Sequence, residues 1–411
     1  MNLILPTARG IVFLFVTAGS AGVALVNVGL ATALTASSLC GILFSSFILA
    51  LFSLYGIEVK RVPNRDGERG RRVFLPVTLI NRTRRYRQSV IIREKCPFVE
   101  GGTNNFPVPP LGPKEELIVD RWMPAASRGY YKLRKITLIG GDPAGLFSRR
   151  RTFLLTGAVM IYPEIASLTW LPIKIHKRAM PAVEGRLLGV SGQGQELFGI
   201  RGYRSYDEVR FIHWKASASK RHLMVKEFEA NTVDEVNILL DAESASIGTD
   251  PNDSNFEFLI KTASSITSYL AEMYCRLQFI THGPGNTIIR LRGDAAGVKT
   301  KIISALAVLE PQKVPLIELL DGELEHIFAN SIFYCLTMSE PDSLQYRFEG
   351  LMERGIEIRW IYAPKEYFPM IIEPDVPRKI KKGKVKINLS GAVSPYVATF
   401  ETDVSGMLRN D

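Results

Sequence analysis

From Gly10 to Ile57 the sequence contains no Asp, Glu, Lys or Arg. This uncharged length is about twice the roughly 20 apolar residues that one membrane-spanning helix needs. It predicts two membrane helices, about Gly10–Leu30 and Leu34–Tyr55, joined by a short turn near Ala31–Ala33. The alternative is a cleaved secretory signal, but the first apolar run is too long for its hydrophobic core and a second run follows at once. We therefore predict that residues 1–57 form a two-helix membrane anchor.

Cysteine is scarce, and the common catalytic motifs are missing. The chain has four cysteines without Cys-x-x-Cys spacing, and Cys40 lies inside the second apolar run. Neither a disulfide framework nor a zinc site is indicated, which agrees with a reducing compartment. No nucleophile elbow is present, and Gly192-Gln193-Gly194 lacks the Lys-Ser/Thr that a phosphate-binding loop requires.

Basic residues are concentrated next to the uncharged segment. Gly56 to Glu100 holds twelve Lys or Arg against five Asp or Glu, a net +7 out of the +10 of the whole chain. Arg9 lies at the same end of the predicted helical hairpin, whereas the turn carries no charge. The positive-inside rule then places both termini and everything after residue 57 in the cytoplasm, with the basic excess attracted to anionic lipid. Nucleic-acid binding is not favoured, because no nucleic-acid fold signature accompanies these residues.

Short alternating runs separated by turn residues predict a small antiparallel β-sandwich over residues 58–165. Asp142–Phe147 is expected to be a turn followed by apolar anchors, with a structural role. Residues 166–231 are expected to form a connector and then the signature segment described below. The candidate strands of the sandwich are Val73–Asn81, Ser89–Lys95, Leu117–Arg121, Tyr130–Ile139 and Ala158–Tyr162.

From residue 232 to 411, apolar runs of strand length alternate with helical periodicity, which predicts a doubly wound α/β domain. The first strand ends in Asp241. No role is predicted for the basic tail around Lys379–Lys386. The predicted strands are Val236–Leu240, Leu277–Thr281, Ile288–Leu291 at an edge, Ile332–Thr337 and Ile356–Ala363; the predicted helices are Asn255–Arg276, Gly297–Leu309 and Ser343–Arg354.

The segment from Gly192 to Glu229, here called the signature segment, mixes charges of both signs with large aromatic residues. Such a mixture is typical of a recognition surface or a structured polar network. Its order resembles the family named domain of unknown function 58, with Tyr206 and Ser219 where that family usually has glycine and arginine. The resemblance is close at the centre of the chain and looser at its flanks. The residues that carry it are Glu196, Arg201-x-Tyr203, Asp207-Glu208-x-Arg210 and Ile212-His213-Trp214-Lys215-Ala216-Ser217-Ala218.

The resemblance implies a von Willebrand factor A-like fold for the C-terminal domain. Domains of that type hold a magnesium ion through Asp-x-Ser-x-Ser at the end of the first strand. Here Glu243 and Ala245 occupy the two serine positions after Asp241, and Ser244 and Ser246 are each displaced by one. We therefore expect a domain that keeps the fold and has lost the ion. A magnesium site that includes Asp241 and Ser244 is the alternative.

The resemblance also implies a partner, a MoxR-type AAA+ ATPase, a class thought to act in the maturation or assembly of other proteins. The favoured function is a membrane-anchored, cytoplasm-facing adaptor of the bacterial inner membrane without enzymatic activity. We expect Arg201, Asp207 and Arg210 to form a charged network with Trp214 packed beneath it. The alternative is a membrane-bound hydrolase that uses Asp207 or Glu208 with His213. No oligomeric state is predicted. The candidate network or partner-binding residues are Glu196, Arg201, Tyr203, Asp207, Glu208, Arg210, Trp214 and Lys215.

Overall fold

The computed structural model divides the chain into two compact units, Met1–Tyr162 and Pro163–Asp411. Each unit has its own apolar core. The basic tail around Lys379–Lys386 lies outside the described residues. The structure describes residues 2–26, 29–63, 65–171, 175–180, 197–204, 209–233, 235–273, 275–329, 331–339, 344–369 and 393–409.

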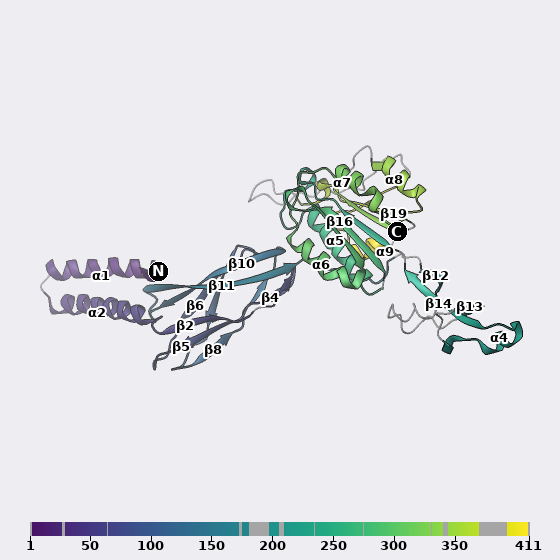
Figure 1. Cartoon of the computed structure of the whole chain (residues 1–411). Coiled ribbons are helices and arrows are strands. Elements are labelled where there is room, and N and C mark those ends of the chain that lie inside the picture. The colour runs from purple at the N-terminus through teal and green to yellow at the C-terminus, as the bar shows by residue number, and fades with distance from the viewer. Residues whose placement is uncertain are drawn as a thin grey trace. The chain divides into compact units, whose positions relative to one another are not determined.

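Two long apolar helices begin the N-terminal unit, α1 (Ala8–Val26) and α2 (Leu30–Phe52) (Figure 1). Both are long and apolar enough to cross a membrane, and only 11% and 17% of their apolar windows are buried, unlike the core helix of a soluble protein. The predicted pair of helices is confirmed. The predicted turn at Ala31–Ala33 is wrong, because α2 already begins at Leu30. Gly29 supplies an extended cap there, and the alanines that follow favour helix.

Mainly antiparallel sheets make up the rest of the N-terminal unit. The largest is six-stranded, with the antiparallel path β1-β11-β10-β6-β7 and the short β3 paired in parallel to β11. A three-stranded sheet, β2-β5-β8, and the pair β4-β9 accompany it. The strands are β1 Asn2–Pro6, β2 Ile57–Arg61, β3 Gly67–Glu68, β4 Arg72–Phe74, β5 Val77–Asn81, β6 Val90–Lys95, β7 Thr103–Val108, β8 Glu116–Val119, β9 Trp122–Pro124, β10 Gly129–Gly141 and β11 Phe147–Tyr162.

The largest sheet and the β2-β5-β8 sheet share one apolar core. Leu79 of β5 belongs to the same buried cluster as Ile92 of β6 and Leu138 of β10. The predicted antiparallel sheets are thus confirmed. The prediction of one strand over Val73–Asn81 is wrong, because the chain divides there into β4 and β5. Pro76 lies between them, and proline has no N–H with which to continue a ladder.

The first strand and one tight turn fasten the two helices to these sheets. β1 pairs with the start of β11, so the chain enters α1 directly from the sheet. In the turn between β10 and β11, the Asp142 carboxylate accepts a hydrogen bond from the Phe147 N–H (2.7 Å). The Leu146 carbonyl of this turn accepts from the Thr7 N–H (2.9 Å), and the Phe147 ring meets Phe47 of α2 edge-on at 5.5 Å. The predicted structural role of the turn is confirmed.

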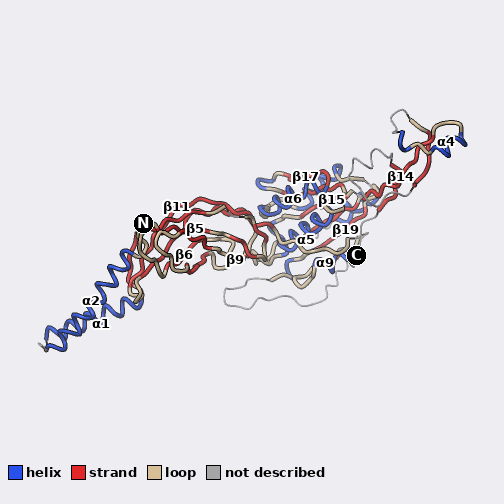
Figure 2. The backbone as a smooth tube through the Cα atoms, turned by 90° about the horizontal axis from the view of Figure 1, so that it is seen from below, coloured by secondary structure: helices blue, strands red, loops and turns tan. Residues whose placement is uncertain are grey.

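A mostly parallel sheet in the order β17-β16-β15-β18-β19-β20 forms the core of the C-terminal unit (Figure 2). Only β17 runs antiparallel, at one edge. Two apolar clusters cover the two faces of this sheet: α5, α6 and α9 pack on one face, and α7 and α8 pack on the other. The elements are β15 Val236–Leu240, α5 Asn255–Leu270, β16 Arg276–His282, β17 Ile288–Asp294, α6 Ala295–Val308, α7 Leu316–Glu323, β18 Ile332–Thr337, α8 Leu344–Glu353, β19 Glu357–Tyr362, β20 Tyr396–Val397 and α9 Val404–Arg409.

The predicted α/β alternation and the edge strand are confirmed. The helix predicted over Asn255–Arg276 ends earlier, at Leu270, because the chain must turn back into β16. α7 was not predicted, since its eight residues are too few to establish a helical period.

The residues expected to form a connector and the signature segment contain a third sheet. Its three antiparallel strands follow the order β12-β14-β13. We call these strands, together with the insert of residues 203–223 between β13 and β14, the β-arm. Its strands are β12 Ile175–Met180, β13 Leu197–Gly202 and β14 Met224–Val233.

Candidate functional site

A short helix, α4 (Trp214–Lys220), lies in the insert of the β-arm and packs on β14. Its N-cap is His213, whose Nδ1 accepts a hydrogen bond from the Ala216 N–H at 3.0 Å. Arg221 ends the helix in the left-handed conformation, with φ 57°. The His213 cap satisfies a backbone N–H that the start of a helix would otherwise leave open, and the left-handed residue stops the helix at its other end.

Ser217 fastens α4 to the start of β14. Its buried hydroxyl donates to the His213 carbonyl (3.0 Å) and accepts from the Met224 N–H (2.8 Å). The His213 N–H in turn donates to the Met224 carbonyl (2.7 Å). Ile212 and Val225, which are buried, form the adjacent β-bridge. These contacts hold α4 in one orientation on the sheet.

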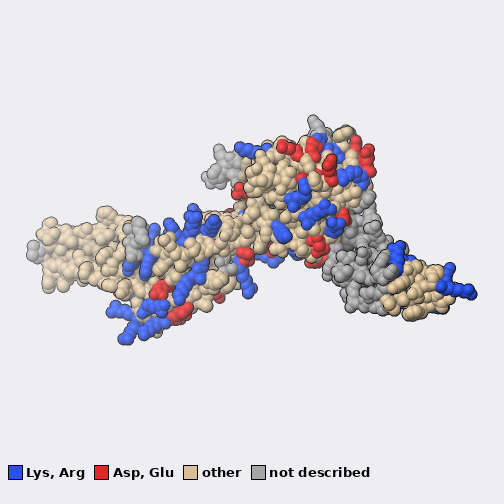
Figure 3. Space-filling view, in the orientation of Figure 1, with Lys and Arg blue, Asp and Glu red and all other residues tan. Residues whose placement is uncertain are grey.

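The open side of α4 is aromatic and basic. Trp214 is 64% exposed, and Val209 and Leu223 are further exposed apolar side chains of the same insert. From residue 209 to residue 226 the chain has five Lys or Arg and no Asp or Glu. Figure 3 shows basic side chains gathered at this end of the β-arm. The exposed ones on and next to α4 are Lys215, Lys220 and Arg221.

The expectation that Trp214 packs beneath a charged network is wrong. Trp214 is the first residue of α4, and a helical side chain leans towards the helix N-terminus. It therefore extends past the end of α4 instead of onto β14. The inward contacts of α4 come from Ser217, the buried residue of this helix.

The structure brings some of the other predicted residues onto the β-arm. Arg201 donates from Nη1 to the Gly202 carbonyl (3.0 Å), and the half-buried Tyr203 donates its N–H to the Leu223 carbonyl (2.8 Å). Lys215 is exposed. The charged network itself stays a prediction. The predicted residues outside the described part of the chain are Glu196, Asp207, Glu208 and the side chain of Arg210.

A second candidate site lies at the carboxyl end of the parallel strands. Asp241 follows β15, and the strand order reverses there, with β16 on one side and β18 on the other. Ligand sites of open α/β sheets lie at this kind of position. Asp241 is 1% exposed, and its Oδ1 and Oδ2 accept hydrogen bonds from the Glu243 and Met338 N–H groups, both at 2.9 Å. The carboxylate therefore ties the loop after β15 to the end of β18.

Burial raises the pKa of Asp241 to about 6. The neighbouring Glu243 charge adds to the rise, whereas the backbone N–H groups of Met338, Glu243 and Ser339 oppose it. The donor set fits magnesium poorly, because Ala245 has no oxygen side chain and both Asp241 oxygens already accept backbone N–H groups. Ser244 is exposed, and its N–H donates to the Gln312 carbonyl (2.7 Å). Nothing in the sequence near Asp241 points to Gln312, some 70 residues away. Within the described residues, no group of three His, Cys, Asp or Glu could hold a metal.

Comparison with known proteins gives a family similarity and weak similarities to solved structures. A search of curated proteins found no match. Among solved structures, the CARDB domain of a Pyrococcus furiosus protein is 16% identical, with 26% of this chain and 94% of that chain covered and a TM-score of 0.18. A Vibrio harveyi GH20 exo-β-N-acetylglucosaminidase is 11% identical, with 75% and 56% covered and a TM-score of 0.19. At these scores neither similarity bears on fold or activity.

The family similarity falls on the β-arm and the adjoining part of the α/β domain. A profile of the family described as "Protein of unknown function DUF58" matches residues 199–315. The matched range begins in β13, contains α4 and Asp241, and ends just before α7. It thus supports the resemblance drawn from the signature segment, over a little more than a quarter of the chain.

Proposed function

We propose that this protein is a membrane-anchored adaptor that binds a partner through the open side of α4. The observation that carries the proposal is the exposure of Trp214 on a helix whose inner side is fastened by Ser217. An exposed tryptophan on a fixed support is preorganised for binding, and tryptophan is enriched among the residues that dominate interface energies. A site for chemistry would place such residues in a pocket instead.

The partner that fits the resemblance is a MoxR-type AAA+ ATPase. The excess of Lys and Arg between residues 209 and 226 favours an acidic docking surface on that partner. We interpret α1 and α2 as the anchor of this protein in a bacterial inner membrane, with both of its termini and both of its units in the cytoplasm. We interpret the N-terminal sheets as a β-sandwich and the C-terminal domain as von Willebrand factor A-like, without a magnesium ion.

A hydrolase built on Asp207 or Glu208 with His213 is not favoured. The Nδ1 atom of His213 already accepts the Ala216 N–H as the cap of α4, and the His213 N–H and carbonyl bond to Met224 and Ser217. These contacts give His213 a structural role. Only its Nε2 would be left for proton transfer.

The test is binding of the full-length protein, purified in detergent, to the MoxR-type ATPase of the same organism. Trp214→Ala should weaken binding by about tenfold or more, the scale of a central interface aromatic. Lys215→Ala should weaken it less and make binding less dependent on salt. Tyr346→Ala on α8 is the matched control, because Tyr346 is 78% exposed and lies outside the β-arm.

Equal binding by Trp214→Ala and Tyr346→Ala would contradict the proposal. So would an Asp207→Ala variant that loses a measured hydrolytic activity while it still binds the ATPase. That second result would favour the hydrolase, and its melting temperature would show whether the variant is folded.

A further inference from the structure

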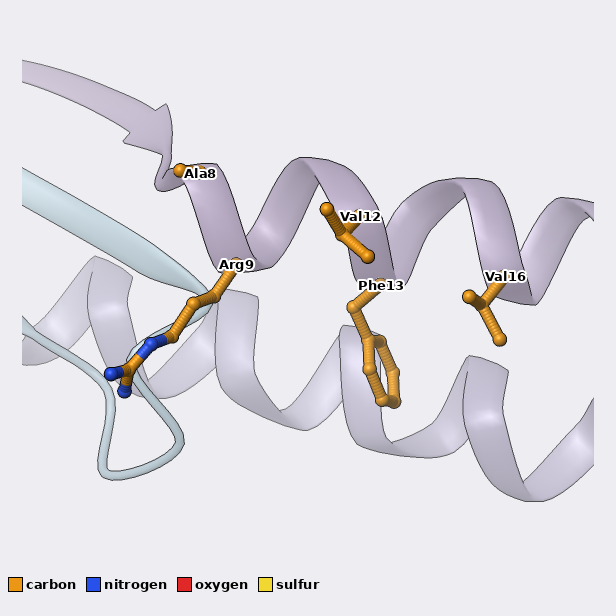
Figure 4. A pocket seen from close by; sticks show the side chains of 5 residues that line it. All are labelled: Ala8, Arg9, Val12, Phe13 and Val16. Carbon is orange, nitrogen blue, oxygen red and sulfur yellow. The ribbon is translucent and has the colours of Figure 1, made fainter.

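A shallow groove of about 410 Å³ runs along one face of α1, at the end that joins the β-sheets (Figure 4). Arg9 lies at one end of the groove, and apolar side chains continue from it along the helix. Arg9 is also the only Asp, Glu, Lys or Arg between residues 1 and 57. The groove thus combines one positive charge with an apolar track. Its lining residues are Ala8, Arg9, Val12, Phe13 and Val16.

The end of α2 lies at the same end of the helical hairpin and is also positively charged. Arg87 donates from Nη1 to the Phe52 carbonyl (2.8 Å), and Arg149 donates to the Leu51 carbonyl. Neither guanidinium has a carboxylate within salt-bridge distance in the part of the chain that the structure describes. Burial, and then a neighbouring arginine in each case, lowers the pKa of both groups.

The sheet register fixes these charges at one level along the hairpin. Ile4 of β1 pairs with Arg149 of β11, and α1 begins four residues after Ile4, at Ala8. Arg9 and the two arginines at the end of α2 therefore lie where the apolar helices meet the polar β-sheets. If the helices span a membrane, this level is the lipid headgroup region.

We propose that one anionic phospholipid binds in the groove, with its phosphate on Arg9 and an acyl chain along Val12, Phe13 and Val16. Arg9 has no carboxylate within salt-bridge distance among the described residues. A phosphate matches such a guanidinium, because it accepts two parallel hydrogen bonds. The apolar track suits a hydrocarbon chain. Arg87 and Arg149 at the end of α2, which have no carboxylate partner among the described residues, add attraction for negative charge. The proposal rests on the membrane anchorage proposed above.

The experiment reconstitutes the full-length protein into nanodiscs of phosphatidylcholine with a minor share of phosphatidylglycerol. Native mass spectrometry then counts the lipids retained after release from the disc. The wild type should retain phosphatidylglycerol in preference to phosphatidylcholine. Arg9→Gln should lower that preference by about fivefold, the effect of one basic residue at an anionic surface. Val16→Trp, which fills the groove and keeps Arg9, should lower it as well.

Arg134→Gln is the matched control. Arg134 is exposed on β10, six residues before Gly140, whose neighbours are Ser53 and Leu54 at the end of α2. At about 3.3 Å per residue it lies about 20 Å along the strand from the helices. Equal retention of both lipids by the wild type, an unchanged preference in Arg9→Gln, or an equal loss in Arg134→Gln would each overturn the site. Failure of the protein to enter nanodiscs would instead contradict the anchorage itself.

Discussion

Charged residues have opposite environments in the N-terminal unit and in the β-arm. Glu94 of β6 is 1% exposed, and its carboxylate pairs with Arg61 and, at 2.8 Å, with the fully buried Arg121. Lys215 on α4 is exposed and has no carboxylate partner among the described residues. A buried charge with two partners fixes how the strands meet, and removing one partner is costly. A charge on an open face costs little to leave unpaired and is available to another molecule.

The network expected at Arg201, Asp207 and Arg210 stays a prediction, because Asp207 and the Arg210 side chain lie outside the described residues. The buried network that the structure describes joins Glu94 to β2 and to the loop before β9. Its members are separated by 33 and 27 residues. No local pattern marks such a cluster, because only the packing of sheets brings the three side chains together.

The largest effect is expected from Glu94→Gln. The substitution keeps the volume but leaves two buried guanidinium groups without a counter-charge, so the free energy of unfolding should fall by about 3–5 kcal/mol. Chemical unfolding of the full-length protein in detergent measures it. Glu58→Gln is the control, because Glu58 pairs with Arg82 at 3.0 Å on an exposed surface. That change should cost about 1 kcal/mol or less. Equal effects of both variants would mean that Glu94 is not buried as described.

The next effect is the pH dependence that Asp241 adds to stability. Its pKa is about 6 when folded, against a usual value of 3.8, so the folded state holds the proton more tightly. Protonated Asp241 therefore contributes about 3 kcal/mol to the unfolding free energy below pH 4. This contribution is lost as the pH rises through the folded-state pKa of about 6. The measurement is the difference in unfolding free energy between the wild type and Asp241→Asn at several pH values. A difference that does not change with pH would show that Asp241 titrates normally.

A smaller and local effect is expected from Ser217→Ala. Removing the hydroxyl leaves the Met224 N–H without its partner beneath α4, at a cost of about 1–3 kcal/mol. Hydrogen exchange of the His213 amide should become faster by the factor that corresponds to this loss, because the His213 N–H also donates to the Met224 carbonyl of β14. Ser219→Ala, on the exposed side of α4, should change the rate by the equivalent of less than about 0.5 kcal/mol. Similar rates in the two variants would mean that Ser217 does not hold the helix.

The smallest effect on stability is expected from Trp214→Ala. With most of the side chain exposed, the unfolding free energy should change by less than about 0.5 kcal/mol. Phe348→Ala, which removes a buried ring at 5.4 Å from Trp360, should cost about 3–5 kcal/mol. Melting curves of both variants give the comparison. A large loss in Trp214→Ala would mean that the tryptophan is packed, as first expected, and would remove the basis of the docking surface.

Local pattern alone was enough to find the elements with a strong period or a long uniform composition. The uncharged stretch marked α1 and α2, and the apolar run that ends in Asp241 marked β15. Backbone geometry imposes these patterns within a few neighbouring residues, so they are visible in the chain itself. The order of Arg201, Trp214 and Lys215 was likewise enough to place the signature segment near a known family.

Tertiary structure decided which of these residues are buried and which are open. β1 is a strand because it pairs with the edge of β11. Arg121 is buried because Glu94, on another strand, supplies its counter-charge. Trp214 is exposed because the Ser217 contacts fix α4 on β14 in one orientation. Each outcome depends on partners distant in sequence or on the direction of a single side chain. Burial or exposure of these side chains does not follow from residue type, since the same charged and aromatic residues suit a core network and an open surface equally well.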